Sequence, residues 1–294
     1  MEKKLLLIVN PVSGQKKAVK SLGAILEVFS AAGYLSTVAM TAHSGHATAI
    51  AREYAGKYDL VVCAGGDGTL NETISGVLAS GAQPSIAYLP CGTTNDLAAT
   101  LNLSRDLAQA ARDAVCGRIR YLDIGSFGER RFVYTASFGA FTKTSYSTPQ
   151  SMKNALGHLA YVLEGAKEVL NIKSVRAKVK TDAGDFEGDY IFGAVTNTTS
   201  LAGILTLDKS TVSLDDGLFE LLLVEKPENA LETSRLINQI LQKRFDDKLK
   251  LFKVSCAEIE TDEPVDWTLD GEQAQGILRV SIQNHANAVR LIVP

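Results

Sequence analysis

Three apolar runs, each followed by a turn of small and polar residues and then by a helical pattern, constrain the fold of this chain most. The runs cover residues 3–9, 60–63 and 85–89. A short apolar run between turn signals is typical of a strand buried on both faces, and alternation with helices predicts a parallel sheet. We therefore predict an α/β nucleotide-binding domain over residues 1–123, to which residues 288–294 return as a strand.

The turn after the second run contains Gly65, Gly66, Asp67, Gly68 and Thr69. Glycine lets backbone amides approach a ligand closely, and the amides at the start of the next helix attract anions. A carboxylate among those amides would repel a phosphate unless a divalent cation lay between them, so Asp67 indicates a nucleotide held with Mg²⁺. The alternative is a tight turn without a ligand, because short turns of Gly and Asp are common.

The other two turns have a similar composition. Residues 10–14 read NPVSG, and residues 90–96 read PCGTTND. Because the carboxyl ends of parallel strands meet at one edge of a sheet, where open α/β folds bind ligands, we expect the three turns to lie together. Neither the P-loop pattern nor the dinucleotide pattern G-x-G-x-x-G is present, which disfavours both of those classes.

The pattern changes after Asp123 to strands separated by turns. In residues 175–180 the apolar Val175, Ala177 and Val179 alternate with basic residues, so one face of that strand is solvated and the sheet is antiparallel. We predict a β-sandwich-like domain over residues 124–287, with strands at 131–137, 175–180, 186–195, 218–224, 254–260 and 276–283. Apolar residues at helical spacing predict inserted helices over residues 152–170 and 236–245.

Composition excludes several classes. A chain of 294 residues with 46% hydrophobic residues has ample length for a buried core, and a net charge of −3 disfavours nucleic-acid binding. The start MEKKLLLIV has too short an apolar stretch for a signal peptide, and no run reaches the roughly 18 apolar residues that span a bilayer. The four cysteines lack C-x-x-C spacing, which fits reduced thiols in the cytoplasm.

Four sequence blocks, in this order, resemble the diacylglycerol kinase catalytic family, which also includes sphingosine and ceramide kinases. They are NPVSG at 10–14, GGDGTLNE at 65–72, LPCGTTND at 89–96 and LDGE at 269–272. The similarity spans nearly the whole chain and is of the kind seen in compact bacterial lipid kinases. It implies an α/β domain like that of NAD kinases and phosphofructokinases, which share GGDGT, followed by a domain that binds the lipid acceptor.

The resemblance also implies cofactors and binding residues. ATP and Mg²⁺ are expected in the first domain, held by the three turns and by Thr41 at the end of another strand. The expected residues are Asn10, Pro11, Ser13, Gly14, Thr41, Gly66, Asp67, Gly68, Thr69, Asn71, Glu72 and Thr94.

Two carboxylates, Asp270 and Glu272, flank Gly271 between two apolar runs. Asp-Gly is a strong hairpin signal, so a plain turn is one interpretation. Phosphoryl transfer to an alcohol benefits from a carboxylate that accepts the hydroxyl proton, so a catalytic segment is the other. The resemblance favours catalysis, with Glu272 or Asp270 as the base.

Residues 213–218 contain Asp216 and Gly217 and are most simply a solvated turn. The carbonyls of Ser213 and Leu218, together with the Asp216 carboxylate, would form an oxygen-rich site suited to Mg²⁺. In similar bacterial lipid kinases this position holds a structural magnesium, so the resemblance implies a metal site at Ser213, Asp216 and Leu218.

Two further patterns favour structure over function. His43 and His46 have H-x-x-H spacing, but no nearby Cys, Asp or Glu completes a metal site. The basic groups, Lys16, Lys17 and Lys20 in the first domain and Lys243, Arg244, Lys248 and Lys250 in the second, are typical of solvated faces, with contact to anionic lipid headgroups as the alternative.

We therefore predict a cytoplasmic, Mg²⁺-dependent lipid kinase of phospholipid metabolism. It would phosphorylate the hydroxyl of diacylglycerol or a related lipid and contact the inner membrane face only peripherally. The alternatives are a soluble-metabolite kinase of the NAD kinase type and a catalytically silent nucleotide-binding regulator. No nucleic-acid partner is expected, and the oligomeric state stays open, with a homodimer as one alternative.

Overall fold

Residue contacts divide the chain into two units. Unit 1 comprises Met1–Ile124 together with Ala286–Pro294, and unit 2 comprises Gly125–His285. The computed structural model describes residues 2–93, 95–140, 171–201, 205–207 and 212–294. The helix expected over residues 152–170 and the site residue Thr94 lie outside these ranges. Within them, no helix has the length and apolar character needed to cross a membrane.

Unit 1 is built on parallel strands. β1 (Lys3–Val9) pairs with β2 (Tyr34–Met40) on one side and with β3 (Leu60–Gly65) on the other, and β3 pairs with β4 (Ser85–Pro90). Nearly all side chains of β3 and β4 are buried, as expected when helices cover both faces of a parallel sheet. The strand order β2-β1-β3-β4 places a topological switch point between β1 and β3, where open α/β sheets bind ligands.

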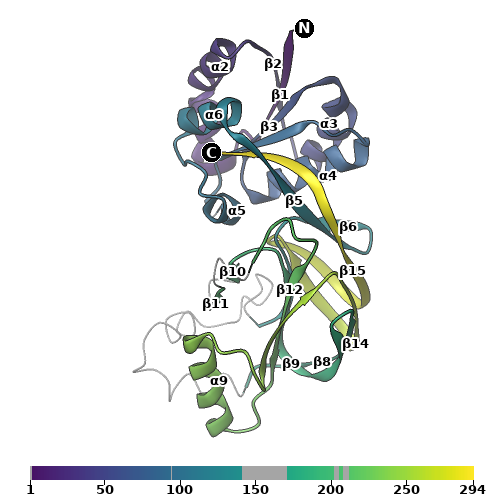
Figure 1. Cartoon of the computed structure of the whole chain (residues 1–294). Coiled ribbons are helices and arrows are strands. Elements are labelled where there is room, and N and C mark those ends of the chain that lie inside the picture. Colours follow the sequence, from purple (N-terminus) through teal and green to yellow (C-terminus); the bar gives the residue numbers. More distant parts are fainter. Residues whose placement is uncertain (1, 94, 141–170, 202–204, 208–211) are drawn as a thin grey trace. The chain divides into compact units, whose positions relative to one another are not determined.

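Helices cover both faces of this sheet, with α2 (Leu22–Ala31) and α6 (Leu107–Cys116) on one side and α3 (His46–Tyr54) and α4 (Asp67–Ser80) on the other (Figure 1). α3 and α4 cross closely at Gly76, where a Cβ atom would lie 2.4 Å from the carbonyl oxygen of Thr48. The shorter helices are η1 (Ser13–Lys16), α1 (Lys17–Lys20), η2 (Ala55–Lys57) and α5 (Asp96–Thr100).

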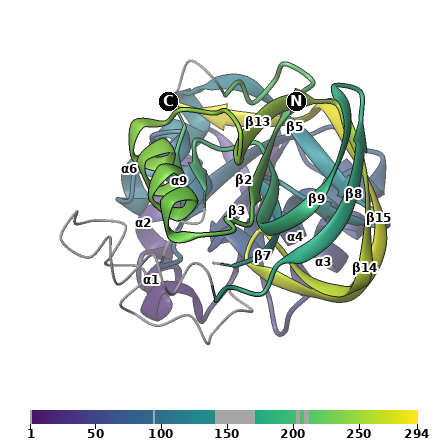
Figure 2. The same cartoon turned by 90° about the horizontal axis from the view of Figure 1, so that it is seen from below.

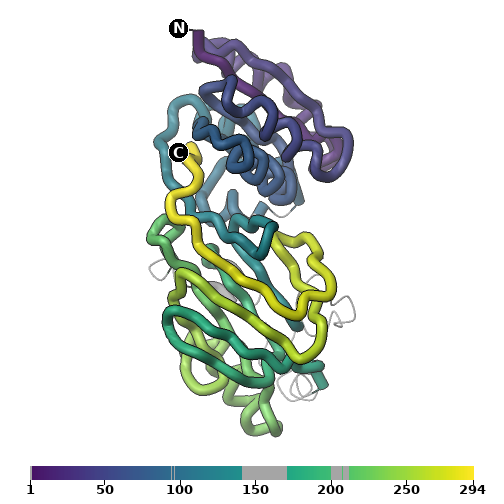
Figure 3. Tube along the Cα trace, turned by 90° about the vertical axis from the view of Figure 1, so that its right-hand side faces the viewer, coloured from purple at the N-terminus to yellow at the C-terminus, as the bar shows by residue number. Residues whose placement is uncertain are grey.

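A strand from much later in the chain completes the sheet of unit 1. Two strands, β5 (Arg118–Phe127) and β15 (Glu272–Val293), have residues in both units. Near its end β15 pairs in parallel with β4, with Leu291 opposite Ile86. In Figure 3 the yellow end of the chain accordingly belongs to the same unit as the purple beginning.

Unit 2 is built mainly on antiparallel strands in the order β13-β12-β9-β7-β14-β15. β8 pairs with both β9 and β14, and Figure 2 shows β8 and β9 side by side. Trp267 is buried in its core, with its ring centroid 4.9 Å from that of Phe127 and 4.7 Å from that of Phe138. The remaining elements are β6 (Arg130–Phe132), β7 (Thr135–Gly139), β8 (Val175–Thr181), β9 (Gly184–Thr196), β10 (Ser200–Leu201), β11 (Leu205–Thr206), β12 (Phe219–Glu225), α9 (Ala230–Gln242), β13 (Leu249–Val254) and β14 (Cys256–Leu269).

Two of the predicted strands are wrong as single elements. Residues 131–137 form parts of β6 and β7, because the amides of Val133, Tyr134 and Thr135 bind the carboxylate of Asp270. Residues 254–260 are divided between β13 and β14 at Ser255, whose amide binds the carboxylate of Asp182. In both places a carboxylate that is distant in sequence accepts hydrogen bonds from backbone amides, which are then not available for pairing with a neighbouring strand.

The predicted helix over residues 236–245 also ends earlier than expected. α9 stops at Gln242, because Lys243 adopts the left-handed conformation (φ 53°). The Arg244 amide then bonds back to the carbonyl of Gln239 at 2.9 Å, which closes the last turn and leaves Phe245 outside the helix.

Candidate functional site

The turns after β1, β3 and β4 meet at the carboxyl edge of the sheet in unit 1. The side-chain amide of Asn10 donates to the hydroxyl of Thr69 at 3.0 Å, which joins the first turn to the start of α4. The amide of Cys91 donates to the carbonyl of Gly65 at 2.7 Å, which joins the third turn to the second. The expected convergence of the three turns is therefore present, and it lies at the switch point between β1 and β3.

Glycines allow these backbones to approach one another. Gly14 has a φ of +50°, and a Cβ atom there would lie 1.7 Å from the carbonyl oxygen of Cys91. A Cβ atom on Gly92 would lie 2.7 Å from the Cα atom of Gly66. A larger residue at Gly14 or Gly92 would force the turns apart.

The start of α4 is open to an anion. Gly66 is its N-cap residue and has no side chain to cover the amides of the first turn, which include those of Gly68 and Thr69. Asp67 occupies that turn and is partly buried. Ser13 lies close by, because its Oγ atom would be 3.7 Å from a Cβ atom on Gly66. A phosphate with a divalent cation suits this set of donors and the single carboxylate.

Asn10 and Asn71 have internal partners as well. The Oδ1 atom of Asn10 accepts from the amide of Val12 at 3.1 Å, which fixes the turn that contains Pro11. The Oδ1 atom of Asn71 accepts from the Ser75 hydroxyl at 3.3 Å, one turn along α4.

Glu72 binds the turn after β2. Its carboxylate accepts from the amide of Gly45 at 2.7 Å, from the amide of Ala47 at 3.1 Å and from the hydroxyl of Ser44 at 3.3 Å. Thr41 begins the same turn, and its amide bonds to the carbonyl of Val9 at 2.9 Å. Glu72 thus connects α4 with the segment that contains Thr41, on the side of β1 opposite to β3.

Asn95 holds the third turn in shape, a role that sequence reasoning missed. It is buried in the left-handed conformation (φ 54°), and its side chain both accepts from the amide of Gly92 at 2.9 Å and donates to the carbonyl of that residue at 2.7 Å. The hydroxyl of Tyr88 also donates to it at 3.0 Å. Asparagine tolerates the left-handed conformation better than most residues. Its position after Gly-Thr-Thr was therefore the one sequence signal for this turn.

Cys91 is a poor candidate for a nucleophile at this site. Burial raises the pKa of its thiol to about 11, although Lys17 acts in the opposite direction. The thiol is therefore protonated at neutral pH, which favours direct transfer of a group over a covalent intermediate at this residue.

The LDGE segment in unit 2 forms the hairpin between β14 and β15. Asp270 and Gly271 make a two-residue turn with φ values of 49° and 89°, as a type I′ turn requires. The Asp270 carboxylate is buried, and the amides of residues 133, 134 and 135 donate to it at 2.6, 3.0 and 2.9 Å. Asp270 therefore fixes the hairpin against the connection between β6 and β7.

Glu272 has a different environment. It begins β15, its side chain is 48% exposed, and its carboxylate lies 3.6 Å from the guanidinium of Arg130. Of the two carboxylates in this hairpin, Glu272 is accessible to a substrate, whereas Asp270 is enclosed by backbone.

The predicted metal loop in unit 2 is paired with a cationic side chain from β13, that of Lys253. The Asp216 carboxylate accepts from the amide of Leu218 at 3.1 Å and pairs with the ammonium of Lys253 at 2.8 Å. The Ser213 hydroxyl donates to Asp215. The oxygen ligands are of the kind that Mg²⁺ prefers, and an ion bound to Asp216 would compete with Lys253 for this carboxylate.

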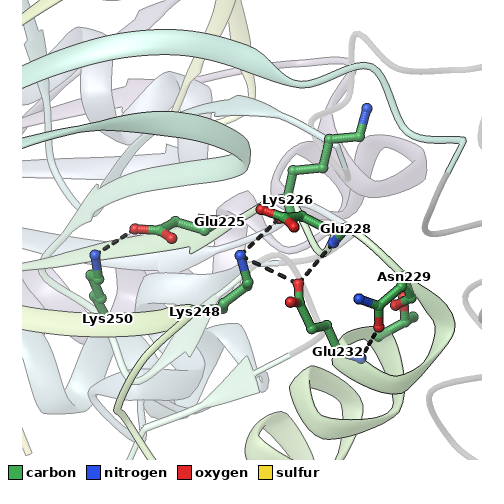
Figure 4. Close-up of polar contacts among 8 residues, drawn as sticks. Glu225, Lys226, Glu228, Asn229, Glu232, Lys248 and Lys250 are labelled. Atoms are coloured by element: carbon green, nitrogen blue, oxygen red, sulfur yellow. Dashed lines mark hydrogen bonds and ion pairs between the residues drawn. The ribbon is translucent and has the colours of Figure 1, made fainter.

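Two of the basic residues singled out in unit 2 are used internally (Figure 4). Lys248 lies 3.4 Å from the carboxylate of Glu232 and 3.4 Å from the carbonyl oxygen of Lys226, and Lys250 pairs with Glu225. Glu232 also accepts from the amide of Glu228 at the start of α9. The charges of Lys248 and Lys250 are therefore each balanced by a carboxylate of the same unit.

Comparison with known proteins gives consistent matches. The family described as the diacylglycerol kinase catalytic domain matches residues 4–127. A diacylglycerol kinase of Bacillus subtilis (strain 168) is 32% identical over 296 residues, which cover 99% of this chain and 97% of that protein. One of Staphylococcus epidermidis (strain ATCC 12228 / FDA PCI 1200) is 31% identical, covering 100% of this chain and 93% of that protein.

A solved structure shows the same fold. The crystal structure of a diacylglycerol kinase from Bacillus anthracis str. Sterne superimposes with a TM-score of 0.79 at 24% sequence identity, covering 100% of this chain and 97% of that chain.

Proposed function

We propose a residue-level mechanism for this chain, which belongs to the diacylglycerol kinase catalytic family. It is a lipid kinase, and its relatives give no support to a soluble-metabolite kinase or a silent regulator. The finer assignment is that it transfers the γ-phosphoryl group of ATP to the hydroxyl of diacylglycerol or a related lipid. Unit 1 binds the nucleotide, and unit 2 binds the acceptor.

One observation carries the nucleotide assignment. Three glycine-containing turns converge at the switch point of the sheet, next to the start of α4, which has no side-chain cap. The backbone amides of Gly66, Gly68 and Thr69 hold the phosphates, with Ser13 beside them. Asp67 is the residue that would hold Mg²⁺. When bound, this ion neutralises charge on the transferring phosphoryl group. Asn10 aligns the first turn through its bond to Thr69.

Glu272 acts as the general base, and Asp270 is a positioning residue. The accessible Glu272 carboxylate accepts the proton of the lipid hydroxyl while the oxygen of that hydroxyl forms a bond to the γ-phosphorus and the bond to the ADP oxygen breaks. Asp270 keeps the hairpin in place through its three amide contacts. The exposure of Glu272 and the enclosure of Asp270 support this division of roles.

The loop with Ser213, Asp216 and Leu218 is a structural cation site away from the chemistry. Its oxygen donors support this assignment, and its competition with Lys253 makes it weaker than a preformed site.

The remaining assignments are coarser. All four cysteines are free, which supports a reducing compartment such as the cytoplasm. The protein reaches its lipid substrate by peripheral contact with the membrane. A homodimer is one oligomeric state in which it would act. We also retain the likeness of unit 1 to NAD kinases and phosphofructokinases and of unit 2 to a β-sandwich.

A direct experiment tests this function. The protein is incubated with γ-labelled ATP, Mg²⁺ and a panel of lipids that includes diacylglycerol, sphingosine and ceramide, and label is followed into each lipid. We expect label in diacylglycerol. Label in a different lipid would correct the acceptor, and label in none of them, in a protein that binds ATP, would contradict the proposed chemistry.

A further inference from the structure

Two imidazole rings are stacked between the end of β2 and the first residue of α3. The ring centroids of His43 and His46 are 5.0 Å apart, and the ring planes differ by 15°. His43 is exposed, and His46 is partly buried behind it. The pair therefore presents a flat aromatic surface to solvent at the carboxyl edge of the sheet.

The segment that carries this stack is held by several contacts. The amide of Ala42 donates to the Nδ1 atom of His46 at 3.0 Å, which fixes the orientation of this ring. The His43 Nδ1 atom lies 2.8 Å from the carbonyl oxygen of Ser44. Glu72 accepts the amides of Gly45 and Ala47 from the other side. A surface fixed in this way can receive a planar ligand without first ordering a loop.

The stack also lies on the appropriate side of the phosphate turns. β2 is the neighbour of β1, and the amide of Thr41 bonds to the last residue of β1, Val9. Glu72 is five residues beyond Asp67 in α4, which corresponds to about 7.5 Å along the helix axis. Through Glu72 and the pairing of β2 with β1, the segment that carries the stack is therefore joined to the helix and the strand that lead to the proposed phosphate turns.

We propose that the exposed face of His43, supported by His46, is the surface on which the purine base of the nucleotide stacks. This inference rests on the proposed nucleotide site in unit 1 and adds the position and the chemistry that recognise the base. Stacking on an aromatic side chain depends on the ring face and not on a charge. Glu72 then has a positioning role, because it holds the segment that carries the platform.

A metal site is the competing explanation for these residues. Two imidazoles alone are a poor zinc site, which normally has at least three protein ligands. In the described part of the chain, no group of three His, Cys, Asp or Glu residues is arranged to hold a metal ion. The Nδ1 atom of His46 is moreover already used by Ala42.

The test measures binding of ATP and of inorganic tripolyphosphate, without lipid, by calorimetry. His43→Ala should weaken ATP binding by about fivefold to hundredfold, the usual effect of losing one base–aromatic stack, and should leave tripolyphosphate binding unchanged. His43→Phe keeps a ring and should bind ATP within about threefold of the native protein. Since His43 is exposed, both variants should keep the native melting temperature.

Tyr54→Ala is the matched control. It removes another exposed aromatic ring from the last turn of α3, about 12 Å along the axis from His46, and should leave ATP binding unchanged.

Three results would overturn the inference. They are unchanged ATP binding in His43→Ala, equal weakening of ATP and tripolyphosphate, and failure of His43→Phe to restore affinity. Failure of the proposed function has a different signature, because the native protein would then bind no ATP or would bind it without labelling a lipid.

Discussion

The carboxylate of Glu72 accepts a hydrogen bond from the amide of Gly45 at 2.7 Å, so the last residue of the GGDGTLNE block binds the turn after β2. This contact joins α4, which begins at the phosphate turn, to the segment that contains Thr41 and the two histidines.

We predict that Glu72→Ala lowers the free energy of unfolding by about 1–3 kcal/mol, because the amides of Gly45 and Ala47 lose a charged acceptor. The KM for ATP should rise at the same time. Glu72→Gln keeps one carbonyl oxygen and should show smaller changes in both quantities. Urea denaturation and ATP titration measure them, and a Glu72→Ala protein that is as stable as the native one would refute the bridging role.

Asp67→Asn should leave the melting temperature unchanged and lower kcat by at least about 10²-fold, since the phosphate turn would lose the ligand for its cation. Asp106→Asn is the matched control, because Asp106 caps the start of α6 through a bond to Gln109 and lies outside the proposed site. Its kcat should be native. Normal turnover of Asp67→Asn would remove Asp67 from the metal site.

Asp270→Asn and Glu272→Gln should have different consequences. Glu272→Gln should melt like the native protein and bind ATP normally, yet lose roughly 10²–10⁴ in kcat, the scale of general-base catalysis. Asp270→Asn should lose stability as well as activity, because an amide group cannot accept all three buried amides of residues 133–135.

Glu258→Gln provides the control for this pair, since Glu258 is also a carboxylate of unit 2 in an exposed ion pair, with Arg279. It should retain native kcat and stability. If Glu272→Gln turned over normally, the base would have to be sought elsewhere in unit 2.

Mg²⁺ should raise the melting temperature of the nucleotide-free protein by mass action at the Asp216 loop. The increase should shrink in Asp216→Ala. It should grow in Lys253→Met, because the ammonium that competes for the Asp216 carboxylate is removed. Thermal melts with and without Mg²⁺ decide the matter, and equal increases in all three proteins would place the ion elsewhere.

Acid should destabilise the protein through His285. Burial, together with the positive charge of Arg131, lowers the pKa of this imidazole, and the guanidinium of Arg131 donates to its Nε2 atom at 2.6 Å. The unfolded chain therefore binds a proton more readily than the folded one. The contribution of His285 is complete above the unfolded pKa of about 6.5 and is lost as the pH falls through the lower folded pKa.

His285→Gln tests this prediction, because glutamine accepts a hydrogen bond without titrating. Urea denaturation at pH 8 and at pH 5 should show a smaller loss of stability on acidification in the variant. An identical loss in both proteins would assign the acid sensitivity to other groups.

Local patterns were sufficient for much of unit 1. The apolar runs at 3–9 and 85–89 match β1 and β4, and the turns that follow them converge as expected because parallel strands leave them no other edge. Patterns were insufficient where a distant side chain determined the result. Asp182 and Asp270 each interrupt a predicted strand by accepting hydrogen bonds from distant amides. Neighbouring residues in the sequence do not reveal these contacts or the bond of Glu72 to the turn after β2.

The LDGE segment illustrates a different limit. A hairpin and a catalytic segment were weighed as alternatives, yet the backbone is a hairpin whose two carboxylates differ in exposure. Sequence spacing could not show which of Asp270 and Glu272 is exposed. The burial of Asp270 depends on the β6–β7 connection, which lies more than a hundred residues earlier in the chain.

The pairing of β15 with β4 bears on how the protein is made. Leu291 and Ile86 are roughly 200 residues apart, so the sheet of unit 1 contains a contact of very high sequence separation. While a ribosome is still translating unit 2, β4 has emerged without that neighbour and presents an open backbone edge. A ribosome stalled before residue 286 should therefore carry a first unit that is more sensitive to protease than the same unit in the finished protein.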